Sequence, residues 1–172
     1  YTISTNLSLT AKKTASYLNK QKLESSDRKL TIGSISFAIS RYFKNGITVY
    51  LKPQYNAGLK LLDAKQDQQW LTDDIPKAQF QTFKLYGSIS KRFQIPKINA
   101  PITLSTQIDS QISQDTLFGS EQFSVGGYYS VRGFRENNIN GDHGYYFRNK
   151  ASFNLGQILV PILTKKAGDK KD

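Results

Sequence analysis

The sequence contains no cysteine, no methionine and a single histidine, His143. Without cysteine there can be no disulfide scaffold, and thiolate or imidazole metal sites lack their usual ligands. A run of about twenty consecutive apolar residues is also missing, which excludes membrane proteins built from helices. The chain starts within a patterned segment, without an initiating methionine or a charged and apolar leader. We therefore expect it to be a piece of a longer protein.

Apolar residues are few, at 38%, and the mean hydropathy is -0.50. Transmembrane β-barrels remain possible, because their strands alternate apolar and polar residues and keep the average hydropathy low. Acidic residues are outnumbered, with 13 against 24 basic ones and a net charge of +11. Such a surplus can indicate nucleic-acid binding. Since the basic residues are spread over the chain instead of forming one patch, we reject nucleic acid as a partner.

Alternation with a period of two is the main pattern of the sequence, and it is typical of strands with one apolar face. It recurs in six segments, at residues 1–12, 34–43, 47–61, 82–92, 102–112 and 145–155. No helical pattern separates them, so we predict an all-β antiparallel meander. Pro53 lies inside the third segment and predicts a bulge or a missing ladder bond there. Asn45-Gly46 between two alternating segments predicts a hairpin with a type I′ turn.

The connections between these segments are alternately long and short. They are predicted at residues 20–28, 45–46, 63–77, 96–101 and 115–144. Successive hairpin connections fall at alternate ends of a sheet, so all long loops would lie at one end. Outer-membrane barrels have this asymmetry, with short periplasmic turns and long extracellular loops. The apolar face would then meet lipid and the polar face would line a lumen. A soluble sandwich or a lipocalin-like barrel remains the alternative from the pattern alone.

The last long loop is unusual because it is rich in aromatic residues and contains paired glycines, Gly126 and Gly127. Loops of this length are usually functional or disordered, and the aromatic content argues for packing. At its centre stands Val131-Arg132-Gly133-Phe134, and GDHGYYFRNK follows from Gly141. These two stretches resemble the VRGF or VRGY loop and the GDxGxxxRNE segment of the two-partner secretion translocators. This is the haemolysin-activator and filamentous-haemagglutinin transporter family.

The resemblance implies a sixteen-stranded barrel in the bacterial outer membrane, preceded by two periplasmic POTRA domains. It implies that a large haemolysin-like or adhesin-like partner protein is secreted through the barrel. Residues 1–163 would be part of the barrel domain and 164–172 a lysine-rich tail, with the POTRA domains and the final strands absent. We expect this piece alone to be inactive. Lys150 stands where the family commonly has glutamate.

In the family the loop is described as folding back into the barrel, where its arginine meets an acidic residue of the inner wall. Arg132 suits this role because its planar fork can donate two hydrogen bonds to one carboxylate. Asp109 is the only inward carboxylate on the predicted strands and is the candidate partner within this chain. The other site predictions are the loop-packing residues Gly126, Gly127, Tyr128 and Tyr129, the segment Gly141, Asp142, Gly144, Arg148 and Asn149, and the basic lumen residues Lys52, Lys60, Lys84, Arg92 and Lys150.

No catalytic pattern is present, so we predict no enzymatic activity, no cofactor and no metal. His143, Asp142 and the pair Asp73-Asp74 are interpreted as polar loop residues. The predicted partners are the secreted protein, outer-membrane lipid and lipopolysaccharide. Two other functions stay open for such a barrel: an outer-membrane protein assembly insertase of the same superfamily, and a passive porin. A soluble ligand-binding barrel would need the opposite arrangement of faces.

Overall fold

The computed structural model describes residues 1–18, 21–68, 70–95, 100–127, 130 and 138–153. Strands make up the regular structure of these residues, and no α-helix occurs among them. No helix of the described chain is long and apolar enough to cross a membrane. The predicted residues Tyr128, Tyr129 and Val131–Phe134 lie outside the described residues, as does the proposed boundary at residue 163.

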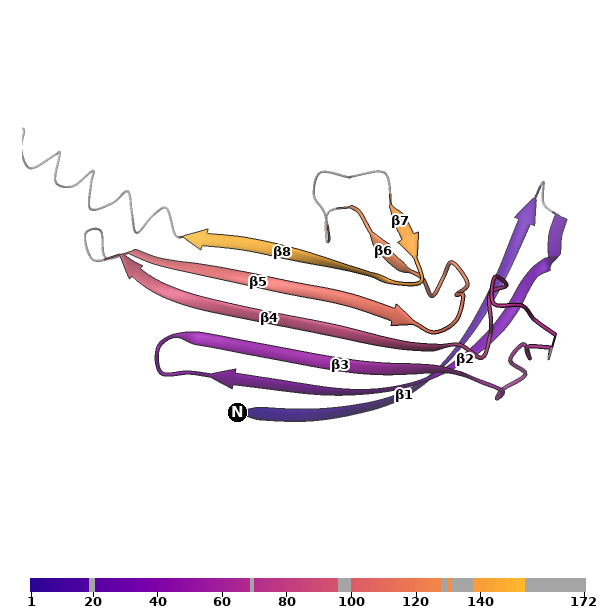
Figure 1. Cartoon of the computed structure of the whole chain (residues 1–172), viewed down its shortest axis with the longest axis horizontal. Coiled ribbons are helices and arrows are strands. Elements are labelled where there is room, and N and C mark those ends of the chain that lie inside the picture. Colours follow the sequence, from indigo (N-terminus) through magenta and orange to yellow (C-terminus); the bar gives the residue numbers. More distant parts are fainter. Residues whose placement is uncertain (19–20, 69, 96–99, 128–129, 131–137, 154–172) are drawn as a thin grey trace, which may run out of the picture.

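Six strands form one antiparallel sheet in the order β1-β2-β3-β4-β5-β8, which confirms the predicted meander (Figure 1). Their bounds are β1 Thr2–Leu18, β2 Gln21–Tyr42, β3 Ile47–Leu59, β4 Gln81–Ile95, β5 Ala100–Ser113 and β8 Gly144–Phe153. The tip of the β1–β2 hairpin, the β3–β4 loop and the segment after β5 lie at one end of the sheet, and the β2–β3 turn lies at the other (Figure 1). We call these the long-loop end and the short-turn end.

A second, two-stranded sheet lies within the last long loop, which was predicted without secondary structure. It pairs β6, Phe123–Val125, with β7, Ile139–Gly141. The loop therefore leaves β5 as a short hairpin whose two arms are held together at the base. In Figure 1 this hairpin stands beside β8.

The register of the large sheet separates two faces, as the alternation predicted. One row across five strands joins Ser36, Gln54, Lys84, Gln111 and Gly144, and belongs to the polar face. A row on the other face, three residues further along, joins Ile39, Leu51, Gly87, Ile108 and Phe147. Large apolar side chains of this second face are exposed, as expected for a surface that meets lipid.

The predicted loop at residues 20–28 is wrong, because β1 continues to Leu18 and β2 already starts at Gln21. The two strands pair along this extension, with a register shift between Thr14 and Ser16. Backbone hydrogen bonds need no apolar face, so a ladder can continue beyond the lipid where the alternation has stopped. The long connection is therefore a long hairpin.

The β2–β3 turn also differs from the predicted type I′ turn. Gly46 has a φ of 77°, but Asn45 is not among the residues with positive φ. The amide of Phe43 donates to the carbonyl of Ile47, and the amide of Gly46 donates to the carbonyl of Phe43. This pattern is a three-residue loop that ends in a left-handed glycine. Only one position needs glycine, so Asn45 can keep an ordinary conformation.

Pro53 interrupts the sheet on one side only, as predicted. Pairing of β2 with β3 stops after Ser36 and Gln54 and resumes at Ile39 and Leu51, which leaves a gap at Pro53. On its other side Pro53 stands opposite Leu85 in a continuous register. Proline has no amide hydrogen, so one of its two neighbouring ladders loses a bond.

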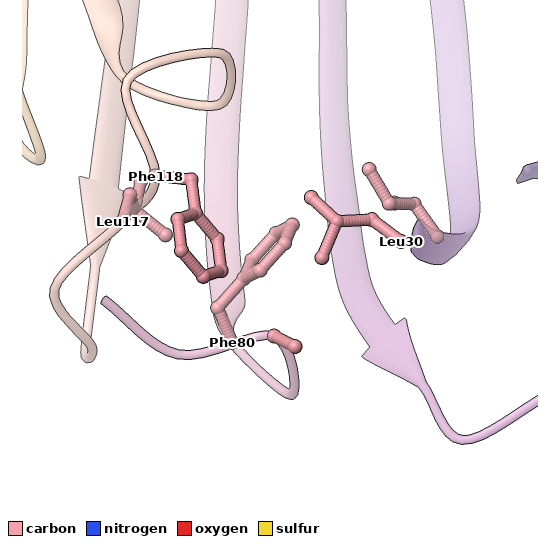
Figure 2. Close-up of a cluster of buried hydrophobic side chains, with 6 residues drawn as sticks. Leu30, Phe80, Leu117 and Phe118 are labelled. Carbon is pink, nitrogen blue, oxygen red and sulfur yellow. The ribbon is translucent and has the colours of Figure 1, made fainter. Parts of the chain in front are cut away.

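A small apolar core lies at the long-loop end, on the face that is polar elsewhere. It consists of Leu30, Ile32, Ala78, Phe80, Leu117 and Phe118. Figure 2 shows Phe80 between Leu30 on one side and Leu117 and Phe118 on the other. The core therefore joins β2 to the β3–β4 loop and to the segment after β5. It fixes these loops against the inner side of the sheet.

Candidate functional site: the polar face and the base of the long loop

The polar face carries most of the predicted basic lumen residues. Lys52 pairs in register with Tyr86, Lys84 with Gln111, Arg92 with Thr103 and Lys150 with Ser105. Arg148 belongs to the same face, opposite Gln107. Lys60 differs, because it lies one residue beyond the end of β3. The structure thus distributes these cations along the sheet instead of gathering them in one site.

Asp109 lies on the polar face of β5 and is half-buried. Its register partner is Tyr146 of β8, whose hydroxyl donates to Oδ2 of Asp109 at 3.4 Å. The carboxylate keeps further acceptor capacity after this one long bond. Arg132 lies outside the described residues, so its pairing with Asp109 remains a prediction.

Lys12 and Glu121 form an ion pair that the sequence did not predict. Lys12 Nζ lies 2.8 Å from Glu121 Oε1, and the Glu121 side chain is only 10% exposed. Lys12 belongs to β1, and Glu121 follows β5. In a flat sheet these strands would be four spacings apart, roughly 19 Å. The segment after β5 must therefore cross the polar face to reach Lys12.

Phe123 supplies a second contact between the long loop and the polar face. Its ring stacks on Tyr146 at a centroid distance of 6.0 Å. A Cβ built on Gly144 would stand 2.5 Å from Phe123 Cδ1, so a side chain at this position would push the ring away. Both Gly144 and Tyr146 belong to the polar face of β8. The β6–β7 hairpin is therefore held against the inner side at its base.

The two arms of the loop are joined by hydrogen bonds of Gln111 and Asp142. Gln111 Nε2 donates to the carbonyls of Glu121 and Asp142, at 3.1 and 3.2 Å. Asp142 Oδ1 accepts from the amide of Leu117 and from the side chain of Gln122, both at 3.1 Å. Asp142 was predicted as part of the segment that follows the loop and as a polar loop residue. In the structure it links the arm that leaves β5 to the arm that returns to β8.

The paired glycines adopt backbone conformations that other residues rarely take. Gly126 has a φ of 146° and Gly127 a φ of 75°, directly after β6. The hydroxyl of Ser130 accepts from the amide of Gly126 at 2.7 Å and donates to its carbonyl. These contacts form a turn at the point where the loop continues toward residue 131. The predicted role of the two glycines in loop packing stays a prediction.

The remaining residues of the predicted segment have different positions. Asn149 lies on the apolar face, where its Oδ1 accepts from the hydroxyl of its register partner Thr106 at 2.9 Å. Gly141 lies in β7, opposite Phe123. His143 is exposed, and its Nδ1 accepts from the amide of Ser113 at 3.2 Å. Among the described residues, no three of His, Cys, Asp and Glu come close enough to hold a metal ion.

The two loops at the long-loop end are joined by polar contacts that sequence reasoning missed. Lys77 Nζ lies 3.1 Å from both Asp115 Oδ1 and Asp73 Oδ1. These hydrogen bonds, with Asp115 the larger cause, raise the pKa of Lys77. Asp67 accepts from the amides of Ala78 and Gln79, at 2.7 and 2.6 Å. The contacts of Asp73 and Asp67 stay within the β3–β4 loop, whereas the contact between Lys77 and Asp115 joins that loop to the segment after β5. No local spacing could have indicated this last contact.

Two cations lie near the ring of Phe118 in the apolar core. The guanidinium carbon of Arg28 lies 4.5 Å from the ring centroid, and Lys65 Nζ lies 5.6 Å from it. Such contacts stabilise exposed pairs by about 0.5–1 kcal/mol each. They extend the attachment of the segment after β5 to β2 and to the β3–β4 loop.

The two faces and the strand order together are those of a segment of an outer-membrane β-barrel. Comparison with known proteins identifies its family. The family described as haemolysin secretion/activation protein ShlB/FhaC/HecB matches residues 1–166. The chain belongs to this family, which is the one that its loop residues resemble.

Two similar relatives are named as transporters. The chain is 35% identical over 144 residues to the outer membrane transporter CdiB of Dickeya dadantii (strain 3937), which covers 84% of this chain and 25% of that protein. It is 30% identical over 169 residues to the hemolysin transporter protein ShlB of Serratia marcescens, which covers 93% of this chain and 28% of that protein. The chain therefore spans about a quarter of the length of these relatives.

The solved structure of CdiB from Escherichia coli has the same fold over this region. It superposes with a TM-score of 0.78 at 31% identity, over 89% of this chain and 28% of that one. CdiB from Acinetobacter baumannii, at 21% identity and a TM-score of 0.70, again shows the fold. The antiparallel sheet is thus a barrel segment of a bacterial outer-membrane protein.

Proposed function

We propose that the whole protein carries a large secreted partner protein, of the haemolysin or adhesin kind, across the outer membrane. In this proposal the polar face lines the path, and the loop between β5 and β8 folds inward to control it. The observation that carries the proposal is the ion pair between Lys12 and Glu121. It directs the start of the loop across the polar face, toward the interior of the barrel.

The other contacts at the base of the loop support the same direction. Phe123 packs over Gly144 and Tyr146, and Gln111 bonds to both arms. All these partners belong to the polar face. In this proposal the loop bound at both arms starts on the polar side of the sheet, and Arg132 at its tip meets the inner wall. An inward carboxylate there would receive the arginine fork, and Asp109 is the candidate that this chain offers.

The basic residues of the polar face fit a path for an extended polypeptide. Lys52, Lys84 and Arg92 lie at different heights of the sheet, so they would attract a polar or acidic segment without holding it at one point. We propose no enzymatic activity and no cofactor, in keeping with a family of transporters. Outer-membrane lipid and lipopolysaccharide would surround the apolar face.

Replacing Arg132 tests the role of the loop in the full-length protein. If its guanidinium is buried against a wall carboxylate, Arg132→Ala leaves that carboxylate unpaired, which costs about 3 to 5 kcal/mol. The paired backbone of the barrel should resist this loss, so we expect normal amounts of folded protein, strongly reduced secretion of the partner and altered single-channel conductance. Arg132→Lys should restore secretion only in part, because an ammonium has no fork. Normal secretion by the alanine variant, at normal expression, would refute the proposal.

A further inference from the structure

Two cations lie on the apolar face at the short-turn end, where a lipid-facing surface would be expected to stay neutral. Arg41 of β2 stands in register with Val49, and Lys91 of β4 stands in register with Ile47. Both partners belong to the outward face. Within the described residues, neither cation forms an ion pair with a carboxylate. Their positive charge is therefore directed toward whatever surrounds the barrel at this level.

Each cation is placed over an aromatic ring of its own strand end. The guanidinium carbon of Arg41 lies 4.7 Å from the centroid of Phe43, and Lys91 Nζ lies 4.8 Å from the centroid of Phe93. The rings hold the charged groups near the surface of the sheet and limit how far they extend into water. The two sites are thus built alike, on two strands that are separated by β3.

The spacing of the two cations suits one anion between them. β2 and β4 are two strand spacings apart, and the rows of Arg41 and Lys91 differ by two residues, which puts their Cα atoms about 12 Å apart. Each charged group lies over the ring two residues further along the chain, so both are directed toward the short-turn end, and two long basic side chains can share an ion over that distance. The surface between them is formed by Ile47 and Val49, which are apolar, so no protein group competes for the anion.

An apolar groove continues from this point along the outward face. Gly87 stands in one row between Leu51 and Ile108 and lies in a shallow groove of about 290 Å³, where a Cβ at this position would stand 3.0 Å from Ile108 Cγ2. The groove is lined on the outward face by Val49, Leu51, Ile89, Thr106, Ile108 and Phe147. Gly87 precedes Lys91 by four positions, roughly 13 Å along β4. A charged site and an apolar groove therefore follow each other along the direction in which a lipid extends.

We propose that this surface is a binding site for one glycerophospholipid, with its phosphate between Arg41 and Lys91 and one acyl chain in the groove over Gly87. The site needs both parts: the cations recognise the phosphate, and the groove recognises the chain. It depends on the placement of the sheet in the membrane and not on secretion, so the two proposals can fail separately.

The test measures lipid binding to the full-length protein in detergent by native mass spectrometry. Dioleoyl phosphatidylglycerol, dioleoylglycerol and dihexanoyl phosphatidylglycerol are the three probes. The first variant is Arg41→Gln with Lys91→Gln, and its matched control is Lys52→Gln with Arg92→Gln, which removes the same charge from the polar face. The second variant is Gly87→Leu, which fills the groove.

We expect the Arg41/Lys91 variant to bind dioleoyl phosphatidylglycerol about thirtyfold more weakly, from the usual contribution of two cations near an anionic headgroup. The Lys52/Arg92 control should bind it normally, and dioleoylglycerol should bind the unmodified protein as weakly as the first variant binds phosphatidylglycerol. Gly87→Leu should weaken the long-chain lipid and leave the short-chain one unchanged. Equal losses in the Arg41/Lys91 variant and its control, or equal binding of dioleoylglycerol, would overturn the proposal. If Gly87→Leu fails to fold, these two comparisons still decide it.

Discussion

Breaking the ion pair between Lys12 and Glu121 should release the start of the long loop from the polar face. At 2.8 Å the Coulomb attraction is about 1.5 kcal/mol at the dielectric constant of water and about 6 kcal/mol at an effective value of about 20. Desolvation of Glu121 and ordering of the lysine side chain offset most of it. Because Lys12 is 42% exposed, the net value should fall near that of surface pairs, about 1 kcal/mol.

Hydrogen exchange of the full-length protein can measure this effect at the amide of Glu121, which donates to the carbonyl of Phe118 at 2.7 Å. A loss of about 1 kcal/mol corresponds to about fivefold faster exchange if opening is local. We expect this faster exchange at the amide of Glu121 in the Lys12→Met variant. Lys13→Met is the matched control, because Lys13 points to the opposite face and should leave the rate unchanged. High salt should reduce the difference between Lys12→Met and the unmodified protein.

The double-mutant cycle distinguishes a direct contact from a general loosening of β1. Glu121→Gln alone should also speed exchange, and adding Lys12→Met to it should change little more. Full additivity of the two substitutions would show that they act separately. In that case the loop would be directed inward by Phe123 and Gln111 alone, and the ion pair would have no part in it.

Two further predictions concern the sheet in the membrane of the full-length protein. Leu104 lies on the outward face and is 46% exposed. Leu104→Arg should therefore destabilise the folded barrel by about 2 to 4 kcal/mol if the position is near the midplane, whereas Gln107→Arg on the polar face should be tolerated. Heat-modifiable gel mobility measures the stability of both variants, and equal damage would mean that the faces are reversed. A tag inserted after Gln66 should be reached by external protease on intact cells and one at Asn45-Gly46 should not; the opposite accessibility would refute the orientation of the loops.

The sheet could be predicted because its signal, the alternation of apolar and polar residues, lies in residues that are close together in the sequence. An apolar residue at every second position follows directly from a strand with lipid on one side, so Leu104 and Gln107 could be assigned to opposite faces from the sequence alone. The prediction was wrong at residues 20–28, where β2 leaves the apolar surroundings that enforce the alternation. Backbone pairing continued there without any pattern to indicate it. The sequence therefore predicts which face a residue lies on better than it predicts where a strand ends.

The contacts at the base of the long loop could not be predicted from the sequence, for a different reason. Lys12 and Glu121 are 109 residues apart, and each has the sequence surroundings of an ordinary surface charge. β6 and β7 have three residues each, which is too short for a recognisable alternation. The resemblance to a family did indicate the loop itself, through Val131–Phe134 and the segment from Gly141. It could not show which residues of this chain contact the base of the loop.

The apolar core of Leu30, Phe80, Leu117 and Phe118 has a consequence for the order in which the chain folds. Each strand of the sheet from β1 to β5 pairs with the next one in sequence, so hairpins can be added one after another at a low entropic cost. The core is different, because Leu117 and Phe118 must return to Leu30 after β5 has been formed. Contacts between distant residues form late. We therefore expect Leu117 and Phe118 to complete the core only once the fifth strand is in place, so that the segment after β5 closes over the inner side of the sheet last.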